Sequence, residues 1–309
     1  EGGRGTGGMC PKGGVIVLQV GEDRAVCLRR GPSLASELIA WRVASALGIP
    51  VARSRLVRYT SQEFEAVLAA EERSRPRCEA DEHMDRLRED APEMFEYCLR
   101  EARRRDGMVA VLEFVPGVRL DCAAPLIADA GEGLLRAIGR LGALDLLLNN
   151  MDRLPLPVWR NRLGNFGNVM VTGGGTGAVG IDQQVYVIGD LAGRERYLDY
   201  VRRFLAALMG EGPEEGNFSL PGVRERLRGA FVHRCQTELP EASLELLLEG
   251  LREGVSAVCG AWSSGRLQAA LDAVEQELAA ECIAEVPPVT AFVCLVAQEV
   301  CAVAAGHGG

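Results

Sequence analysis

The sequence predicts an α+β protein in which a small sheet-bearing domain, residues 1–115, precedes a larger helical domain, residues 116–309. Short apolar runs bounded by glycine and proline indicate strands in the first part of the chain. Beyond residue 197, apolar residues recur at helical spacing, which indicates helices almost throughout. A run of strands followed by a run of helices is typical of this class. The 309 residues, 48% of them hydrophobic, are enough to bury a core.

The first predicted strands carry candidate phosphate-binding residues. Gly13 and Gly14 directly precede the strand expected at residues 15–20, and glycines at such a turn let backbone amides approach phosphates. The next strand, residues 25–30, ends in Arg29 and Arg30, both cationic. These residues are therefore our candidates for contacts with a nucleotide.

A helix is predicted over residues 34–47, between an N-cap at Ser33 and a stop at Gly48. Glu37 lies in its first turn, where an acid favours the helix N-terminus. A strand follows at residues 51–58.

Residues 63–106 are predicted to be a mostly helical, highly charged insertion of the N-terminal domain. Such a segment is usually a solvated surface, and docking of a protein substrate is the alternative. The apolar strand after it, residues 108–115, ends in Glu113, Phe114 and Val115 before a proline-glycine turn, as expected of a link between two domains.

The next helix, residues 134–148, has leucine and isoleucine on one face and an acid, Asp145, beside them. An acid next to an apolar face needs a partner, and Asn149, four residues on, is a candidate.

Three polar residues after this helix form the candidate catalytic centre. Asp152 follows the helix, Asn168 precedes a short strand at residues 169–171, and Asp182 follows a second strand at residues 178–181. A glycine turn, residues 173–177, joins the two strands. In phosphoryl transfer, one acid orients and deprotonates a hydroxyl, while an amide and a second acid hold Mg²⁺. The alternative is that all three are ordinary cap and turn residues.

The spacing differs from that of the standard protein-kinase loop, in which the asparagine lies five residues after the aspartate. Here the two are sixteen positions apart, and an insertion rich in proline and tryptophan, residues 154–166, fills the difference. The run NNMDRLPLPVWRNRLGNFGNVMV, followed by IDQ, resembles the catalytic domain of actin-fragmin kinase. This atypical protein kinase family also includes a kinase-like domain of plant proteins that act on tubulin. The resemblance extends more weakly over residues 13–200.

The resemblance implies a bilobal protein-kinase-like fold that uses ATP and Mg²⁺. It implies Asp152 as catalytic base, Asn168 and Asp182 as metal ligands, and the backbone of residues 113–115 as the adenine-binding hinge. By position, Glu37 matches the helix glutamate that orients the phosphate-binding base. Arg153 is a further catalytic candidate that screens Asp152 or holds phosphate, the alternative being a salt bridge within the loop.

The implied activity is transfer of the ATP γ-phosphate to serine or threonine of a cytoskeletal protein, actin or tubulin. Trp159 in the insertion is either a platform for this substrate or a packing residue beneath the loop. A kinase normally carries a lysine on the strand at residues 25–30, but the only lysine of the chain is Lys12. Either Lys12 or one of Arg29 and Arg30 must then contact the phosphates, and arginine is not a conservative replacement. The missing lysine leaves two alternatives open, a pseudokinase that binds nucleotide or protein and a small-molecule phosphotransferase.

Composition bears on partners and compartment. The net charge is −9 and no long basic stretch occurs, so we expect no nucleic-acid partner. Ten scattered cysteines without a CxxC pair suggest reduced thiols in a cytoplasmic protein. The most apolar tract, residues 289–305, contains Gln298 and Glu299, and we expect it not to span a membrane.

Overall fold

The structure is a computed structural model, and it describes residues 15–19, 25–29, 34–58, 60–66, 69, 107–128, 131–159, 162–281 and 286–306. The chain divides into two compact units. The first comprises Glu1–Leu34 and Arg53–Phe114, and the second comprises Ala35–Ala52 and Val115–Gly309. The predicted α+β class with a bilobal, kinase-like organisation is confirmed, because one described sheet lies in the first unit and most described helices lie in the second.

The first unit contains a four-stranded antiparallel sheet in the order β1-β2-β4-β3. Its strands are β1 (Val15–Gln19), β2 (Ala25–Arg29), β3 (Ser54–Arg58) and β4 (Met108–Glu113). The central strand β4 pairs with both β2 and β3, and four consecutive residues of it are buried, Val109, Ala110, Val111 and Leu112. A strand covered on both faces needs apolar residues at successive positions, which explains the unbroken apolar run in the sequence.

Helix α1 (Leu34–Leu47) has the predicted bounds, but residues from Ala35 onward belong to the second unit. Sequence alone placed this helix in the N-terminal domain. Its contacts explain the difference, because the carboxylate of Glu37 accepts a hydrogen bond from the backbone N–H of Gln183 and Arg42 pairs with Glu277.

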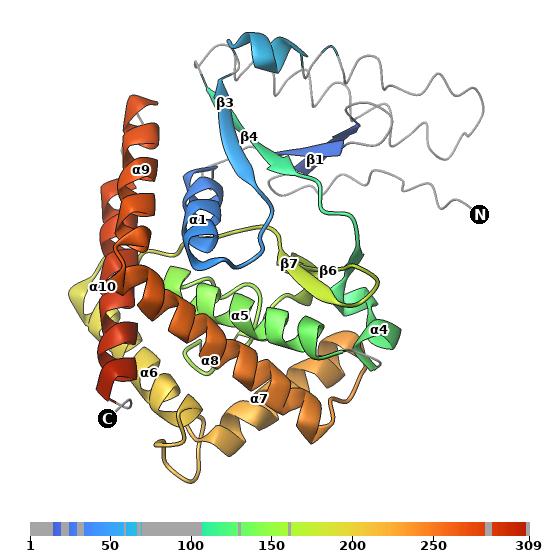
Figure 1. The fold of residues 1–309 in the computed structure, drawn as a ribbon, viewed down its shortest axis with the longest axis vertical. Coiled ribbons are helices and arrows are strands. Elements are labelled where there is room, and N and C mark those ends of the chain that lie inside the picture. The colour runs from blue at the N-terminus through green and yellow to red at the C-terminus, as the bar shows by residue number, and fades with distance from the viewer. Residues whose placement is uncertain are drawn as a thin grey trace. The chain divides into compact units, whose positions relative to one another are not determined.

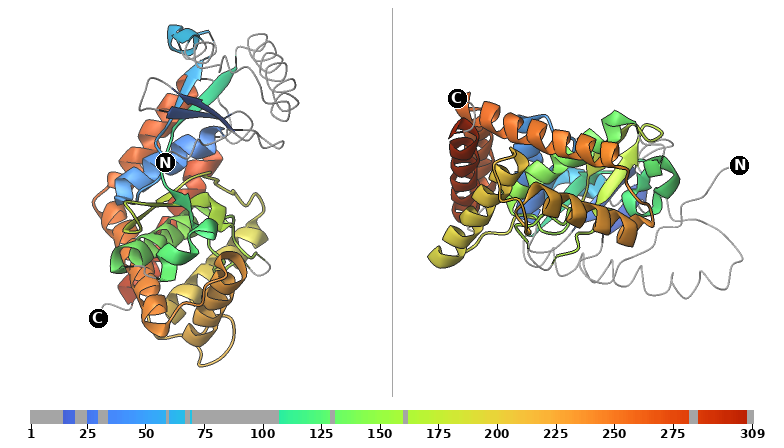
Figure 2. Two further views of the ribbon diagram at one scale, coloured as in Figure 1. Left: turned by 90° about the vertical axis from the view of Figure 1, so that its right-hand side faces the viewer. Right: turned by 90° about the horizontal axis from the view of Figure 1, so that it is seen from below.

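The second unit is built around α5, which is buried along most of its length. Besides α1, its described helices are α4 (Ala124–Ala128), α5 (Glu132–Leu148), α6 (Leu191–Leu208), α7 (Leu220–Cys235), α8 (Glu241–Ser263), α9 (Arg266–Ala280) and α10 (Val286–Gly306). Helix α8 runs beside α5 (Figures 1 and 2). Their backbones approach closely at glycines, since a Cβ atom on Gly250 would lie 2.2 Å from the carbonyl oxygen of Arg136.

Helix α10 is more apolar than its polar residues suggested. Residues Pro288–Gly306 are long and apolar enough to cross a membrane by length and composition. Of the two polar residues in this segment that were expected to prevent a span, Gln298 and Glu299, only Glu299 is charged, so the segment remains apolar enough. Core helices meet the same criterion, and α10 packs against α6, α8 and α9. About a third of this apolar window, 33%, is buried.

A small sheet in the second unit carries the candidate site. It has the order β5-β6-β7, with β5 (Val118–Arg119), β6 (Val169–Thr172) and β7 (Gly177–Gly180). Two short 3₁₀ turns, Leu120–Cys122 and Phe166–Asn168, precede α4 and β6. The glycine turn between β6 and β7 is confirmed: Gly173, Gly174 and Gly175 all have positive φ, a conformation that glycine adopts without steric cost.

Candidate active site

The end of α5 turns sharply toward Asp152. The C-cap residue Asn149 adopts the left-handed conformation, with φ of 52°, and the backbone N–H of Asn150 donates to the carbonyl of Asp145. The side-chain oxygen of Asn150 then accepts the backbone N–H of Asp152 at 3.2 Å. Asp152 is thereby held half-buried directly after the helix, where a catalytic carboxylate was predicted.

Asn168 lies against Asp152 although sixteen positions separate them. Its side-chain Nδ2 donates to the carbonyl oxygen of Asp152 at 2.9 Å and to the Asp152 carboxylate at 3.2 Å. The amide oxygen, Oδ1, accepts a longer bond of 3.3 Å from Asn165. The amide oxygen has two lone pairs, of which Asn165 uses one. The other is available to a hard cation.

The β6-β7 hairpin brings Asp182 next to this pair. The ladder continues past the strands, since the backbone N–H of Ile181 donates to the carbonyl of Asn168 at 3.0 Å. Asp182 follows with φ of 53°. A left-handed conformation is uncommon for a residue other than glycine, costs on the order of 1 kcal/mol, and is concentrated at functional sites.

The oxygen donors of Asn168 and Asp182 fit Mg²⁺, which prefers hard oxygen ligands. Among the described residues, no group of three or more His, Cys, Asp or Glu side chains is arranged to hold a metal. Mg²⁺ is usually bound by one or two protein carboxylates together with substrate phosphates and water, and Asp182 with the amide oxygen of Asn168 is a ligand set of that size.

The insertion between Asp152 and Asn168 is a closed loop. The backbone N–H of Asn165 donates to the carbonyl of Arg153 at 3.1 Å, so the chain leaves and returns at the same point. The loop in between, residues 154–164, contains eleven residues, and without them the separation of Asp152 and Asn168 falls from sixteen positions to five. Five is the spacing of the standard kinase loop. With the loop left out of the count, Asp152 and Asn168 therefore keep the spacing of the standard kinase loop.

The loop packs inward and is held by side chains from two helices. Trp159 is buried and donates its indole N–H to Asn149 at 2.8 Å, which supports the packing alternative for this residue rather than the substrate platform. Arg226 of α7 donates to the carbonyls of Pro155 at 2.6 Å, Trp159 at 2.7 Å and Arg162 at 2.9 Å. Sequence reasoning missed Arg226, because nothing local connects it with a loop more than sixty positions away.

Arg153 takes a different role from the phosphate contact expected of it. Its side chain is fully buried and forms an ion pair with the buried carboxylate of Asp145. A group without solvent exposure does not reach a phosphate in this structure, and the salt bridge of Arg153 joins the loop to Asp145 of α5 instead of lying within the loop. The partner expected for Asp145, Asn149, is instead directed toward Trp159 and toward the carbonyl of Tyr186.

Burial raises the pKa of Asp145 to about 7, despite the opposing effects of Arg153 and of the amide of Asn150. Asn150 donates to Asp145 at 3.1 Å. Burial favours the protonated carboxyl of Asp145, whereas Arg153 and Asn150 favour its charged form. With a pKa of about 7, the carboxyl changes its protonation near neutral pH.

The remaining predicted nucleotide contacts are placed only in part. Arg29 is the last residue of β2, and Glu113 ends β4, where its carboxylate accepts the backbone N–H of Arg53 at 3.2 Å. The chain passes from the first compact unit to the second between Phe114 and Val115. Lys12, Gly13, Gly14 and Arg30 lie outside the described residues, as does most of the predicted insertion at residues 63–106.

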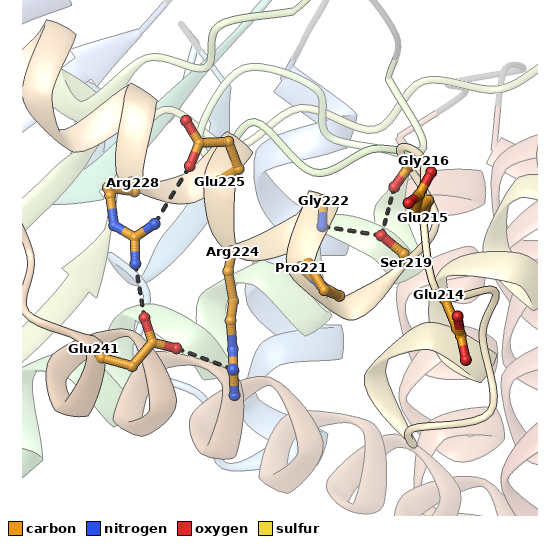
Figure 3. A pocket seen from close by; sticks show the side chains of 10 residues that line it. All are labelled: Glu214, Glu215, Gly216, Ser219, Pro221, Gly222, Arg224, Glu225, Arg228 and Glu241. Atoms are coloured by element: carbon orange, nitrogen blue, oxygen red, sulfur yellow. Dashed lines mark hydrogen bonds and ion pairs between the residues drawn. The ribbon is translucent and has the colours of Figure 1, made fainter.

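A polar pocket of about 580 Å³ lies at the beginning of α7 and α8 (Figure 3). Ser219 caps α7 by accepting the backbone N–H of Gly222 at 3.1 Å. Arg224 and Arg228 both pair with Glu241 across the pocket. Both arginines are thus paired, and the pocket lining contains none of the predicted catalytic residues.

The loop, the asparagine and the hairpin together are the features of a kinase catalytic centre. The sequence profile of the family described as Actin-fragmin kinase, catalytic, matches residues 10–177, more than half of the chain. The chain belongs to this family. The match includes Asp152, Asn168 and the whole insertion, and it ends just before Asp182, whose place in the site therefore rests on the hairpin geometry. No curated protein shows significant similarity to the chain.

Membership confirms the resemblance predicted from the sequence and indicates an atypical protein kinase. Use of ATP, ordinarily with Mg²⁺, is implied by the family.

Proposed function

We propose that this member of the actin-fragmin kinase family transfers the γ-phosphoryl group of Mg²⁺-bound ATP to a serine or threonine of a cytoskeletal protein, actin or tubulin, in the cytoplasm. The observation that carries the proposal is the position of Asn168. The side-chain nitrogen of Asn168 donates to Asp152. The backbone carbonyl of Asn168 accepts the backbone N–H of Ile181, the residue that precedes Asp182. Candidate base and candidate metal ligands are thus joined in one hydrogen-bonded unit.

Each residue has a distinct role in the proposed reaction. The half-buried carboxylate of Asp152 orients the substrate hydroxyl and accepts its proton. Asn168 and Asp182 would hold Mg²⁺ through their side-chain oxygens. When bound, ATP would supply the phosphoryl group, and Mg²⁺ would neutralise the charge that develops on the phosphoryl oxygens.

A protein substrate is favoured by exposed apolar side chains that follow Asp182. Leu191 is 72% exposed, and Tyr186 and Val187 are also exposed. The backbone of Tyr186 is held in place, since its N–H donates to the carbonyl of Leu148 and its carbonyl accepts from the side chain of Asn149. We take these exposed apolar side chains, which are close together in the chain, as a candidate contact surface for another protein. The net charge of −9 argues against nucleic acid or an anionic membrane as the partner.

A pseudokinase is the second candidate, and one observation favours it. Strand β2, which precedes α1, ends in Arg29, and no described residue of the chain is a lysine. An arginine in this place binds phosphate with a longer, planar group, so nucleotide binding can persist while transfer is lost.

The test is γ-phosphate transfer from Mg²⁺·ATP to actin and to tubulin, measured beside nucleotide binding. Transfer to either protein that disappears in Asp152→Asn supports the protein kinase. Nucleotide binding without transfer to any protein, itself included, supports the pseudokinase. Transfer only to a small hydroxyl compound supports a small-molecule phosphotransferase.

A further inference from the structure

The buried guanidinium of Arg153 connects the segments that carry both predicted metal ligands. Its Nε donates to the carbonyl of Asn168 at 3.3 Å, and its Nη2 donates to the carbonyl of Ile181 at 3.2 Å. Nη2 also donates to the side-chain oxygen of Gln183 at 2.7 Å. One acceptor is the backbone carbonyl of Asn168 itself, and the other two belong to the residues directly before and directly after Asp182.

The surrounding structure is adapted to this guanidinium. The side chain of Asp145, which like that of Arg153 has no exposed surface, pairs with it. Gly180 gives it room, since a Cβ atom there would lie 3.1 Å from the central guanidinium carbon. The carboxylate of Glu37 holds Gln183 from the opposite side by accepting its backbone N–H.

Stability alone does not account for this arrangement. A buried ion pair costs desolvation and is often replaceable by apolar residues without loss of stability. Here two further atoms, Oδ2 of Asp145 and Nε2 of Gln183, are buried without a hydrogen-bond partner among the described residues. Such costs are commonly retained where polar groups shape a functional site.

We propose that Arg153 is a positioning residue for the metal, and that it holds the backbones of Asn168 and Ile181 at a fixed separation so that Asn168 and Asp182 present their oxygens to one Mg²⁺. This inference rests on the proposed function. Arginine is required because its planar fork supplies several donors in fixed directions, whereas lysine supplies one compact charge. Arg153→Lys therefore retains the pair with Asp145 and loses the bonds to the two carbonyls.

The experiment measures Mn²⁺ binding to the protein in the presence of the non-hydrolysable analogue AMP-PNP, by electron paramagnetic resonance of free Mn²⁺. Support from outside the ligand shell commonly contributes 10- to 100-fold in metal affinity. We therefore expect Arg153→Lys to weaken Mn²⁺ binding by about 10-fold or more. The Mg²⁺ concentration for half-maximal transfer should rise by the same factor.

Arg252→Met is the matched control. Arg252 also donates to a carbonyl, that of Leu208 at 3.0 Å, and pairs with Glu245 at 2.7 Å, but on α8 and away from the site. It should lose stability and leave Mn²⁺ affinity unchanged. If Arg153→Lys does not fold, the double variant Asp145→Leu with Arg153→Met, which removes both buried charges together, replaces it, with the same expected loss.

The outcomes separate this inference from the proposed function. Wild-type Mn²⁺ affinity in a folded Arg153 variant overturns the positioning role and leaves the kinase proposal intact. Weakened Mn²⁺ binding in a protein that transfers no phosphate supports the positioning role and counts against the kinase proposal. A wild-type protein that binds no Mn²⁺ with AMP-PNP overturns both.

Discussion

The carbonyl-binding arginine of α7, Arg226, offers a direct test of how the insertion is held. Arg226→Met keeps most of the side-chain volume and removes hydrogen bonds to three carbonyls of residues 155, 159 and 162, at 2.6 to 2.9 Å. A hydrogen bond from a charged donor contributes about 1.5–3 kcal/mol net. Because the carbonyls become partly hydrated once the guanidinium is gone, we take about 1 kcal/mol for each, and expect a total loss of about 3 kcal/mol in the free energy of unfolding.

Urea denaturation followed by tryptophan fluorescence measures this loss. Arg228→Met is the matched control on the same helix, because among the described residues Arg228 binds the carboxylates of Glu225 and Glu241 at the surface and no backbone carbonyl. Such pairs contribute about 0–1 kcal/mol. If Arg226→Met lost no more stability than Arg228→Met, the view that Arg226 secures the loop would be refuted.

Three further predictions concern packing and protonation. The raised pKa of Asp145, about 7, means that its carboxyl keeps a proton in the folded state after the unfolded chain has lost it, so its stabilising contribution falls as pH rises from about 4 through 7. Relative to Asp145→Asn, the wild type should lose about 3 kcal/mol between pH 5 and pH 8 in urea denaturation, and a gain would contradict the dominance of burial. Gly250→Ala places a methyl group 2.2 Å from the carbonyl of Arg136, and we expect a loss of about 2 kcal/mol or more in thermal unfolding, whereas unchanged stability would show that α5 and α8 separate freely. Trp159→Phe leaves the buried side-chain oxygen of Asn149 without its donor, and calorimetry should show a loss of about 1–3 kcal/mol in the free energy of unfolding. A loss below about 1 kcal/mol would show that water replaces the indole as donor.

Local signals in the sequence predicted the elements that carry the site. The apolar period of α5, the glycine turn between β6 and β7, and the order of Asp152, Asn168 and Asp182 were sufficient for the α+β class and for the candidate centre. The unusual spacing of Asp152 and Asn168 was interpreted correctly as an insertion, because proline-rich loops can be added without moving their ends.

Contacts between distant residues were not predictable in the same way. The pairing of Glu37 with Gln183 spans 146 positions, and the contacts of Arg226 span more than sixty. The partner of Asp145 was missed for a local reason. Asn149 takes the left-handed conformation at the helix end, which turns its side chain toward Trp159 and leaves Asp145 to Arg153. Helical spacing does not apply once the helix has ended.

The central claim is that Asp152 is the base of a phosphoryl transfer, and one measurement tests it most directly. It is the initial rate of γ-phosphate transfer from Mg²⁺·ATP to actin or tubulin by the wild type, Asp152→Asn and the control Asp199→Asn, whose carboxylate lies half-exposed on α6. We predict that Asp152→Asn lowers the rate at least about 100-fold with little change in ATP affinity, the range of general-base contributions, while Asp199→Asn transfers at the wild-type rate. Equal rates in all three proteins would contradict the claim.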